Sequence, residues 1–471
     1  MQGEKTLRKI ESFKRLVLLC LSGICLLGQV GIYAYFWYTS YYQSVKMYLE
    51  FWERGHWLMI AIFGVLLFFF SNMYGGMRIG YLKNVEVIFS QILSTVIVDL
   101  ITYAQISLMV REFFHVPSYA AMMFLHAVWI IIWINISSLI YKNVFLPRKL
   151  LLVHGDRPIQ DILTKLNSRK DKFEVSKCMN ISAGVEAIKK EALERYDAVV
   201  LWDISVNDRN QIFKFCYGQS IRVYIMPKIP DVILKGSEVL HLFDTPLFLT
   251  REYVLTIEQR FLKRCIDLIF SLILFVIASP FMLLTAIAVK LYDRGPVLYK
   301  QTRCTIGGKE FKILKFRSMR VDAEKDGVAR LASKGDSRIT PVGKFIRKVR
   351  LDELPQLINI IKGDMSFIGP RPERPEIIEQ YMEIMPEFCF RMKVKAGLAG
   401  YAQVYGKYNT TPYDKLKLDL AYIENYSVWL DLKLMLLTVK VLLWPDSTEG
   451  VETDQITALK KEQEAIKKDR E

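Results

Sequence analysis

Two adjacent carboxylates, Asp352 and Glu353, stand at the predicted start of a helix and are well placed to do chemistry. They precede Pro355, which a helix tolerates only in its first turn, and leucines and isoleucines then recur at helical spacing up to Gly363, a suitable C-cap. The helix should therefore begin close to Asp352, where free N–H groups and the helix dipole favour negative charge. We expect both carboxylates to be ionised at neutral pH.

Neighbouring residues of a helix point about 100° apart, so the two carboxylates suit two separate roles rather than one shared proton. One could be a nucleophile while the other holds a metal ion. A purely structural explanation also exists, because aspartate is a good N-cap and glutamate is favoured in the first turn. The helix start alone favours that structural explanation.

Cations lie on both sides of the carboxylates. Gly369-Pro370-Arg371-Pro372 predicts a rigid turn that fixes an arginine, a bidentate ligand for phosphate. Upstream, the chain carries a cluster of further cations: Lys315, Arg317, Arg320, Arg338, Arg347, Lys348 and Arg350. No histidine lies beyond His241, so chemistry in this half proceeds without imidazole. Carboxylate, Mg²⁺ and arginine form a consistent set for phosphoryl transfer, although the charge run alone indicates a solvated or lipid-facing surface.

The composition requires elements of two kinds. The chain has 471 residues and a formal charge of +15, with 52% hydrophobic and 24% charged residues. That length predicts two or three domains, and the balance excludes both a disordered chain and a purely soluble one. The seven cysteines are scattered without a CxxC pair, which argues against a disulfide-stapled secreted protein and against a cysteine-ligated zinc site.

Four apolar stretches, near 16–36, 57–74, 85–110 and 120–141, approach or exceed the ~20 residues that cross a bilayer. The first is too long for a cleavable signal. Basic residues precede the first stretch, separate the second from the third and follow the fourth, so both ends of this bundle should face the cytoplasm. Asp99 lies inside the third stretch without a second charge beside it; it is a functional candidate, and a polar contact between helices is the commoner explanation.

Residues 150–227 alternate short apolar runs with helical segments, which predicts a parallel sheet covered by helices. Such sheets often bind nucleotides at the carboxyl ends of their strands. Here the first strand runs into His154-Gly155-Asp156 rather than a glycine-rich loop. The pattern favours a docking or regulatory domain over a working dinucleotide site.

A fifth apolar run, 265–289, is interrupted by Ser279-Pro280, and proline predicts a kink. Both flanks are basic. A helix that breaks at this pair and returns to the same face keeps the basic C-terminal half in the cytoplasm. An ordinary kinked fifth span is the alternative. Beyond it, Gly307-Gly308 predicts a hairpin whose second arm carries Lys315.

Several motifs of the C-terminal half closely resemble the bacterial sugar transferase family, the polyprenyl-phosphate hexose-1-phosphate transferases. They are Gly295-Pro296-Val297, Lys315-Phe316-Arg317-Ser318-Met319, Leu351-Asp352-Glu353-Leu354-Pro355-Gln356-Leu357, Lys362-Gly363-Asp364-Met365-Ser366, Gly369-Pro370-Arg371-Pro372, Ala402-Gln403-Val404 and Asp419-Leu420-Ala421-Tyr422. Their order and spacing match over about 261–444. The four spans and the middle domain resemble the large, WbaP/WcaJ-like branch of this family.

The resemblance implies transfer of a sugar-1-phosphate from a UDP-sugar to undecaprenyl phosphate with release of UMP, the first membrane step of exopolysaccharide or capsule assembly. By similarity, Asp352 attacks the sugar-bearing phosphorus and forms a covalent phosphosugar intermediate, while Glu353 holds Mg²⁺ as metal ligand. The cations expected around the phosphates are Lys315, Arg317, Arg338, Arg347 and Arg371. The family also breaks a re-entrant membrane helix at a pair like Ser279-Pro280.

The implied fold is an α-helical membrane bundle over 1–148, a Rossmann-like α/β domain over 149–250 and an α+β monotopic catalytic domain over 255–446, followed by a polar tail, 447–471. The re-entrant helix would occupy 265–289. The catalytic domain should act at the cytoplasmic face of the bacterial inner membrane, in contact with membrane lipid. A homodimer is a possibility drawn from the branch, and no nucleic-acid partner is expected.

The chain departs from the family at two places. Thr305 stands where the family usually has glycine, and Ala396-Gly397-Leu398-Ala399-Gly400 replaces Pro-Gly-Leu-Thr-Gly. Two other functions compete with the transferase. One is an idle membrane scaffold whose middle domain senses a nucleotide; the other is a transporter, which would need a second broken helix in a matching repeat. The sugar stays open among glucose, galactose and their N-acetyl relatives.

Overall fold

A computed structural model of the chain describes residues 2–42, 45, 55–113, 115–194, 196–242, 244–250, 254–321, 336, 338–406 and 410–443, with residues 2–12 described by backbone alone. They form two compact units, Met1–Pro227 and Lys228–Glu471. The division falls earlier than the expected boundary at 250, because helix α9 (Ile229–Gly236) packs its Ile229 and Val232 into the core of the second unit. The predicted polar tail lies outside the described residues.

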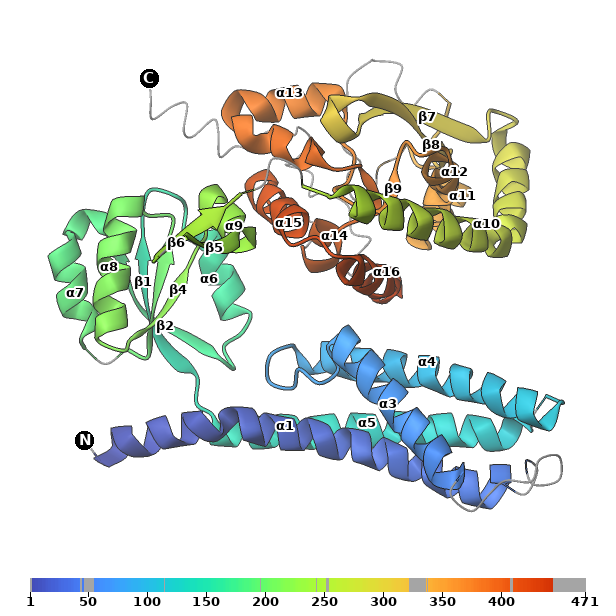
Figure 1. Cartoon of the computed structure of the whole chain (residues 1–471), viewed down its shortest axis with the longest axis horizontal. Helices are drawn as coiled ribbons and strands as arrows, with labels where there is room; N and C mark the ends of the chain where they lie inside the picture. Colours follow the sequence, from blue (N-terminus) through green and yellow to red (C-terminus); the bar gives the residue numbers. More distant parts are fainter. Residues whose placement is uncertain are drawn as a thin grey trace. The chain divides into compact units, whose positions relative to one another are not determined.

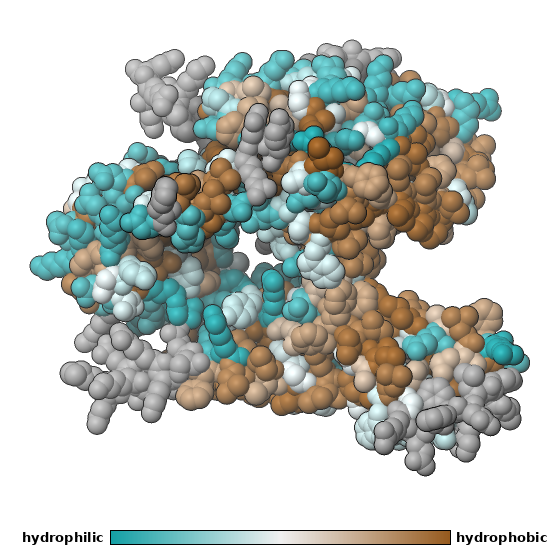
Figure 2. Space-filling view, viewed as in Figure 1, coloured by the Kyte–Doolittle hydropathy of each residue, from teal (hydrophilic) through white to brown (hydrophobic). Residues whose placement is uncertain are grey.

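The first unit begins with four long apolar helices: α1 (Gln2–Phe36), α3 (Gly55–Tyr74), α4 (Asn84–Val110) and α5 (Val116–Val144) (Figure 1). A π-helical turn, η1 (Trp37–Tyr41), continues α1. All four helices are long and apolar enough to cross a membrane, which confirms the predicted apolar helices. Figure 2 shows hydrophobic side chains along their outer surface. That surface suits hydrocarbon rather than water.

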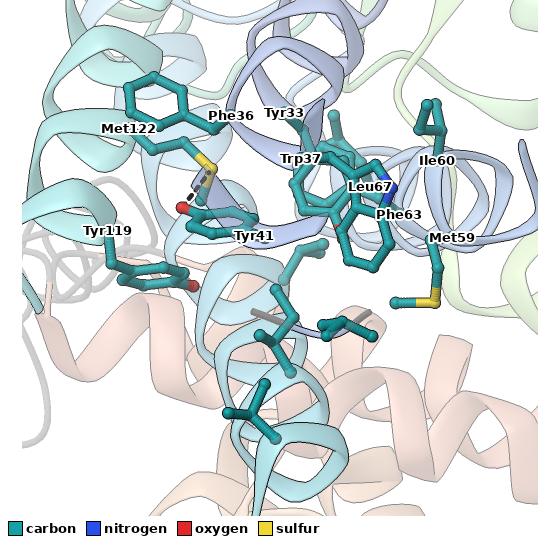
Figure 3. Close-up of a cluster of buried hydrophobic side chains, with 14 of the residues drawn as sticks. Tyr33, Phe36, Trp37, Tyr41, Met59, Ile60, Phe63, Leu67, Tyr119 and Met122 are labelled. Carbon is teal, nitrogen blue, oxygen red and sulfur yellow. Dashed lines mark hydrogen bonds between the residues drawn. The ribbon is translucent and has the colours of Figure 1, made fainter. Parts of the chain in front are cut away.

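Aromatic side chains fill one end of the bundle. The rings of Tyr33 and Phe63 stack with their centroids 4.1 Å apart, and Trp37 beside them is fully buried. The hydroxyl of Tyr41 donates to Sδ of Met122 at 3.4 Å (Figure 3). The tyrosine rings thus contribute apolar area to the core, as aromatic side chains commonly do.

Asp99 has a titratable partner, so the expectation of an isolated carboxylate is wrong. Its Oδ2 lies 3.2 Å from Nδ1 of His126, and Nε2 of His126 lies 3.1 Å from the backbone oxygen of Gln29. A carbonyl only accepts, so Nε2 carries a hydrogen. A neutral ring would then aim a lone pair at the carboxylate, so the contact requires one more proton on either residue. The pair joins α1, α4 and α5, as expected of a polar contact between helices.

Asp99→Asn should leave the bundle folded, because its amide can donate to neutral His126 without the extra proton. Asp99→Leu should destabilise it by about 1–3 kcal/mol, since Nδ1 would stay buried without a partner. Thermal unfolding in detergent measures both variants, and equal losses of Tm in Asp99→Asn and Asp99→Leu would contradict the role of this contact.

The first unit ends in a four-stranded parallel sheet of order β2-β1-β3-β4, as the alternating pattern predicts. Its strands are β1 (Arg148–His154), β2 (Phe173–Asn180), β3 (Ala198–Trp202) and β4 (Arg222–Ile225). Helix α6 (Gln160–Asn167) covers one face, and α7 (Val185–Ala192) and α8 (Val206–Gly218) cover the other (Figure 1). Both faces are buried, which explains the continuous apolar runs. The N–H of Gly155, the first donor after β1, is already bonded to the oxygen of Trp202 at 3.1 Å.

The second unit combines helices with short sheets. Its first part holds hairpin β5 (Glu238–Leu242) and β6 (Thr245–Leu249), helix α10 (Ile257–Asp293), and hairpin β7 (Leu298–Cys304) and β8 (Glu310–Phe316). The rest comprises α11 (Pro341–Lys348), η4 (Leu351–Glu353), α12 (Gln356–Lys362), β9 (Ser366–Ile368), α13 (Pro375–Ile384), η5 (Pro386–Lys393), β10 (Gly397–Ala399), α14 (Tyr401–Tyr405), α15 (Pro412–Glu424) and α16 (Val428–Leu443). The predicted hairpin is confirmed, with Gly307 and Gly308 at its tip in the left-handed region.

Helix α10 contains Pro280 and bends sharply (Figure 1). Pro280 has no N–H for the carbonyl of Val276, four residues back. The hydroxyl of Ser279 donates to that carbonyl at 2.8 Å. The Ser-Pro pair therefore provides both the kink and the replacement hydrogen bond, which matters where water is scarce.

Both ends of α10 are held by other elements of the second unit. Near its start, Nζ of Lys263 lies 2.6 Å from Oδ2 of Asp431 on α16. At its other end, Asp293 forms a two-pronged ion pair with Arg317, which follows β8. The residues between carry exposed apolar side chains, and Figure 2 shows hydrophobic residues where Figure 1 draws this helix.

Candidate active site

The carboxylate pair lies in a short 3₁₀ turn, η4, and not in the first turn of a helix. Pro355 occupies the N-cap position and α12 begins at Gln356, four residues after Asp352. Arg350, two residues before Asp352, adopts a left-handed backbone conformation with φ 58°, so the chain changes direction after α11. The predicted start is therefore too early. Gly363 is confirmed as the C-cap, with φ 94°.

Asn359 holds α12 against β8 and so sets the distance between the carboxylates and Lys315. Its Nδ2 donates to the oxygen of Lys312 at 3.0 Å, and its Oδ1 accepts from the N–H of Leu314 at 3.0 Å. The buried amide of Asn359 therefore forms the backbone hydrogen bonds that a neighbouring strand would otherwise form with β8. Because Asn359 fixes α12, it also fixes η4 just before it.

Three cations surround Glu353. Its Oε1 lies 2.8 Å from Nη2 of Arg371 and 3.1 Å from Nζ of Lys315, and its Oε2 lies 3.8 Å from Nη1 of Arg350. Burial raises the pKa of Glu353, but the charges of these cations outweigh burial and hold the pKa well below its usual value. Glu353 therefore stays ionised far into acid.

Asp352 has the opposite environment. Burial, together with the charge of Glu353, raises the pKa of Asp352 to about 6, although Lys315 and Arg347 act in the other direction. At pH 7 the side chain of Asp352 is mostly ionised, as expected. Its pKa is nevertheless raised, whereas a helix N-terminus would lower it. Two neighbouring carboxylates with opposite shifts are suited to different roles.

The activity of the site should depend on the ionisation of Asp352. If its carboxylate is the nucleophile, the rate should be lost as the pH falls through about 6, approaching tenfold per pH unit below it. The contribution of Asp352 to stability has the reverse sign, because protonation relieves a buried charge, so unfolding would not explain the loss. Initial rates and thermal unfolding measured between about pH 5 and about pH 8 test this; a rate unchanged down to pH 5 would contradict it.

The other predicted cations divide into two groups. Lys315 and Arg371 contact Glu353, and Arg347 lies close enough to lower the pKa of Asp352. Arg317 and Arg338 instead bind carboxylates elsewhere. Arg317 pairs with Asp293 and donates to the oxygen of Pro296 at 2.7 Å, and Arg338 pairs with Asp336 at 2.6 Å. Arg317 and Arg338 thus pair with carboxylates other than Asp352 and Glu353, and their role as phosphate ligands stays a prediction.

Arg350 is a site residue that the sequence reasoning missed. It was visible only as one cation of a basic run, yet its position three residues before Glu353 allows their ion pair. Its backbone φ is positive, which is rare for any residue other than glycine, and such conformations cluster at functional sites.

Backbone bonds hold the turn that carries Arg371. The N–H of Gly369 donates to Ala399 and the N–H of Gly397 donates to Pro370, both at 2.9 Å. The two glycines approach so closely that a Cβ on Gly397 would lie 2.1 Å from the nitrogen of Gly369. From the other side, the guanidinium of Arg391 donates to the oxygen of Arg371 at 2.9 Å. The arginine is thus pre-positioned.

The carboxylates fit Mg²⁺ only together with a phosphorylated ligand. No group of three or more metal-binding side chains occurs among the described residues. Mg²⁺ is commonly held by one or two carboxylates, with substrate phosphates and water completing its shell. Asp352 and Glu353 offer that partial set, and the surrounding cations would favour the phosphates.

Comparison with known proteins identifies the family of this unit. Residues 258–445 match the family described as bacterial sugar transferase. The chain is 38% identical over 256 residues to a UDP-N-acetylgalactosamine-undecaprenyl-phosphate N-acetylgalactosaminephosphotransferase of Aeromonas hydrophila, covering 53% of this chain and 59% of that protein. It is 41% identical over 211 residues to a UDP-glucose:undecaprenyl-phosphate glucose-1-phosphate transferase of Escherichia coli K12, covering 44% of each.

A shorter relative is matched over most of its length. A UDP-glucose:undecaprenyl-phosphate glucose-1-phosphate transferase of Caulobacter vibrioides is 40% identical over 190 residues, covering 39% of this chain and 71% of that protein. The chain spans about half the length of the first two relatives. The family match, residues 258–445, includes the carboxylates, their cations and the kink at Pro280. The chain belongs to the bacterial sugar transferase family.

Proposed function

We propose that the chain transfers a sugar-1-phosphate from a UDP-sugar to undecaprenyl phosphate and releases UMP, initiating the assembly of a cell-surface glycan. The observation that carries the proposal is the carboxylate pair with opposite pKa shifts among Lys315, Arg350 and Arg371. The names of the relatives, which specify glucose, galactose or N-acetylgalactosamine transfer to undecaprenyl phosphate, support it.

The reaction proceeds in two displacements. The carboxylate of Asp352 attacks the phosphorus that bears the sugar, the bond from that phosphorus to the UMP oxygen breaks, and UMP leaves with the electron pair. An oxygen of undecaprenyl phosphate then attacks the same phosphorus and Asp352 leaves as a free carboxylate. The product is the lipid diphosphate sugar.

The fixed cations stabilise the charge that develops on the phosphates. Lys315, Arg350 and Arg371 are held by Glu353 before substrate binds, so little reorganisation is needed during the reaction. Mg²⁺, when bound through Glu353, would withdraw charge from the diphosphate.

The proposal includes a re-entrant arrangement of α10. Lys263 at one end and Asp293 at the other bind the same unit, and Ser279 satisfies the carbonyl that Pro280 leaves without a donor. Basic flanks at both ends favour the cytoplasmic face of the inner membrane for this unit. A lipid phosphate at headgroup level can then meet a soluble nucleotide sugar.

We further propose that the parallel sheet is a Rossmann-like domain with a docking or regulatory role. The N–H of Gly155, which a dinucleotide site would aim at phosphate, is already bonded to Trp202. A homodimer stays part of the proposal, drawn from the resemblance.

The test is UMP release by the purified full chain with undecaprenyl phosphate and Mg²⁺, over a panel of UDP-glucose, UDP-galactose and their N-acetyl forms. We expect release that requires both the lipid and one donor, and that a chelator abolishes. Release from no donor, under conditions in which the Escherichia coli relative works, would favour the idle scaffold.

A further inference from the structure

The side chain of Thr305 bridges two segments of the second unit. Thr305 is buried, with 4% of its surface exposed. Its hydroxyl donates to the oxygen of Asp364 at 3.0 Å and accepts from the N–H of Ala396 at 3.1 Å. Asp364 follows α12, the helix that begins just after the carboxylates, and Ala396 precedes β10.

The bridge continues to the turn that carries Arg371. The oxygen of Ala396 accepts from the N–H of Ser366 at 2.8 Å, and the N–H of Gly397 donates to Pro370 at 2.9 Å. Thr305 therefore bonds the segment after α12 directly. It reaches Pro370, the residue before Arg371, through the neighbouring residues Ala396 and Gly397. Its hydroxyl thus connects the segment after α12, the helix that follows Glu353, with the segment that holds the Arg371 turn.

The two departures from the family pattern meet at this hydrogen bond. A proline at position 396 has no N–H and a fixed φ, so it needs no acceptor and stiffens the segment by itself. Alanine adds a buried N–H, which is costly unless it is bonded. A glycine at position 305 could not accept that bond, whereas threonine does. Thr305 thus supplies the acceptor that the N–H of Ala396 requires.

We propose that Thr305 is a positioning residue for the transferase reaction, and that Thr305 and Ala396 together replace the rigidity of a proline with a side-chain hydrogen bond. The bond keeps the Arg371 turn in register with Glu353. Because kinetics are one readout, the inference rests in part on the proposed function.

The experiment compares Thr305→Val, which keeps the shape but loses the hydroxyl, with Thr305→Ser, which keeps the hydroxyl, each with and without Ala396→Pro. In the wild-type background, Thr305→Val should lower kcat about tenfold with a smaller change in KM, and Thr305→Ser should restore it. In the Ala396→Pro background, Thr305→Val should lower kcat much less, because no N–H is left without an acceptor. Thr438→Val is the matched control, since that hydroxyl donates to the oxygen of Leu434 within its own helix, at 2.7 Å.

Thermal unfolding of the same variants separates this inference from the proposed function. If the wild type releases no UMP, the proposed function fails, while a larger Tm loss from Thr305→Val beside alanine than beside proline still supports the coupling. Equal effects in both backgrounds, or no rescue by Thr305→Ser, would overturn it. Coupling in Tm with an unchanged kcat would overturn the positioning role.

Discussion

Replacing Asp352 by asparagine should reduce UMP release by at least about 10³-fold, because the amide cannot form the phosphosugar bond. The variant should nevertheless unfold at the same temperature or a higher one. Burial raises the pKa of Asp352, which means that its charge destabilises the fold and that a neutral side chain removes this cost. Loss of activity with unchanged or increased Tm is the signature of a nucleophile in a desolvated site.

The matched control is Glu376→Gln, which neutralises an exposed carboxylate in the first turn of α13. It should retain wild-type rates. Incubation with a UDP-sugar labelled in the sugar should leave label on the wild-type protein when undecaprenyl phosphate is omitted, and none on Asp352→Asn. If Asp352→Asn releases UMP at the wild-type rate, the enzymatic activity stands but another residue is the nucleophile.

Glu353→Gln should impair both activity and folding, in contrast to Asp352→Asn. The carboxylate is the counter-charge of Lys315, Arg350 and Arg371, and its side chain is only 14% exposed. Removing one partner of a buried ion pair costs about 3–5 kcal/mol, and the partial exposure of the cations should lower this to about 2–3 kcal/mol. Activity should fall at least about 10²-fold, because the cations lose their common anchor.

Thermal unfolding, denaturant unfolding and UMP release measured on the same preparations test this prediction, again with Glu376→Gln as control. The Tm of Glu353→Gln should fall while that of Asp352→Asn does not. The titration of Mg²⁺ against rate should also shift to higher concentration in Glu353→Gln. A variant as stable as the wild type, with the same Mg²⁺ dependence, would remove Glu353 from both roles.

Much of the architecture could be predicted because it follows from runs of apolar residues and from turn residues that are visible in the sequence. The four apolar helices, the parallel sheet and the hairpin at Gly307-Gly308 all follow from hydropathy and turn residues. The helix begins four residues later than the pattern predicts, because local propensity contains no information on the left-handed conformation of Arg350, which changes the direction of the chain before Asp352. Element boundaries depend on such single conformations.

Residue pairs far apart in sequence could not be predicted. Arg317 belongs to the same basic cluster as Lys315, and only the fold shows that it pairs with Asp293, 24 residues away in the sequence. Likewise, Asp99 and His126 lie on different helices, and nothing in either segment indicates the contact. Charge type identifies candidates for a site, whereas the fold decides which of them lie beside the carboxylates.

The attachment of both ends of α10 to one folded unit has a consequence for the lipid environment. A helix that crosses a bilayer must match its hydrocarbon thickness by tilting or by deforming the lipid. If α10, bent and anchored through Lys263 and Asp293, is re-entrant as proposed above, it enters only one leaflet, and the protein itself sets the depth of the active site. Catalysis should then tolerate bilayers of short or long acyl chains, while α1, α3, α4 and α5 experience the mismatch.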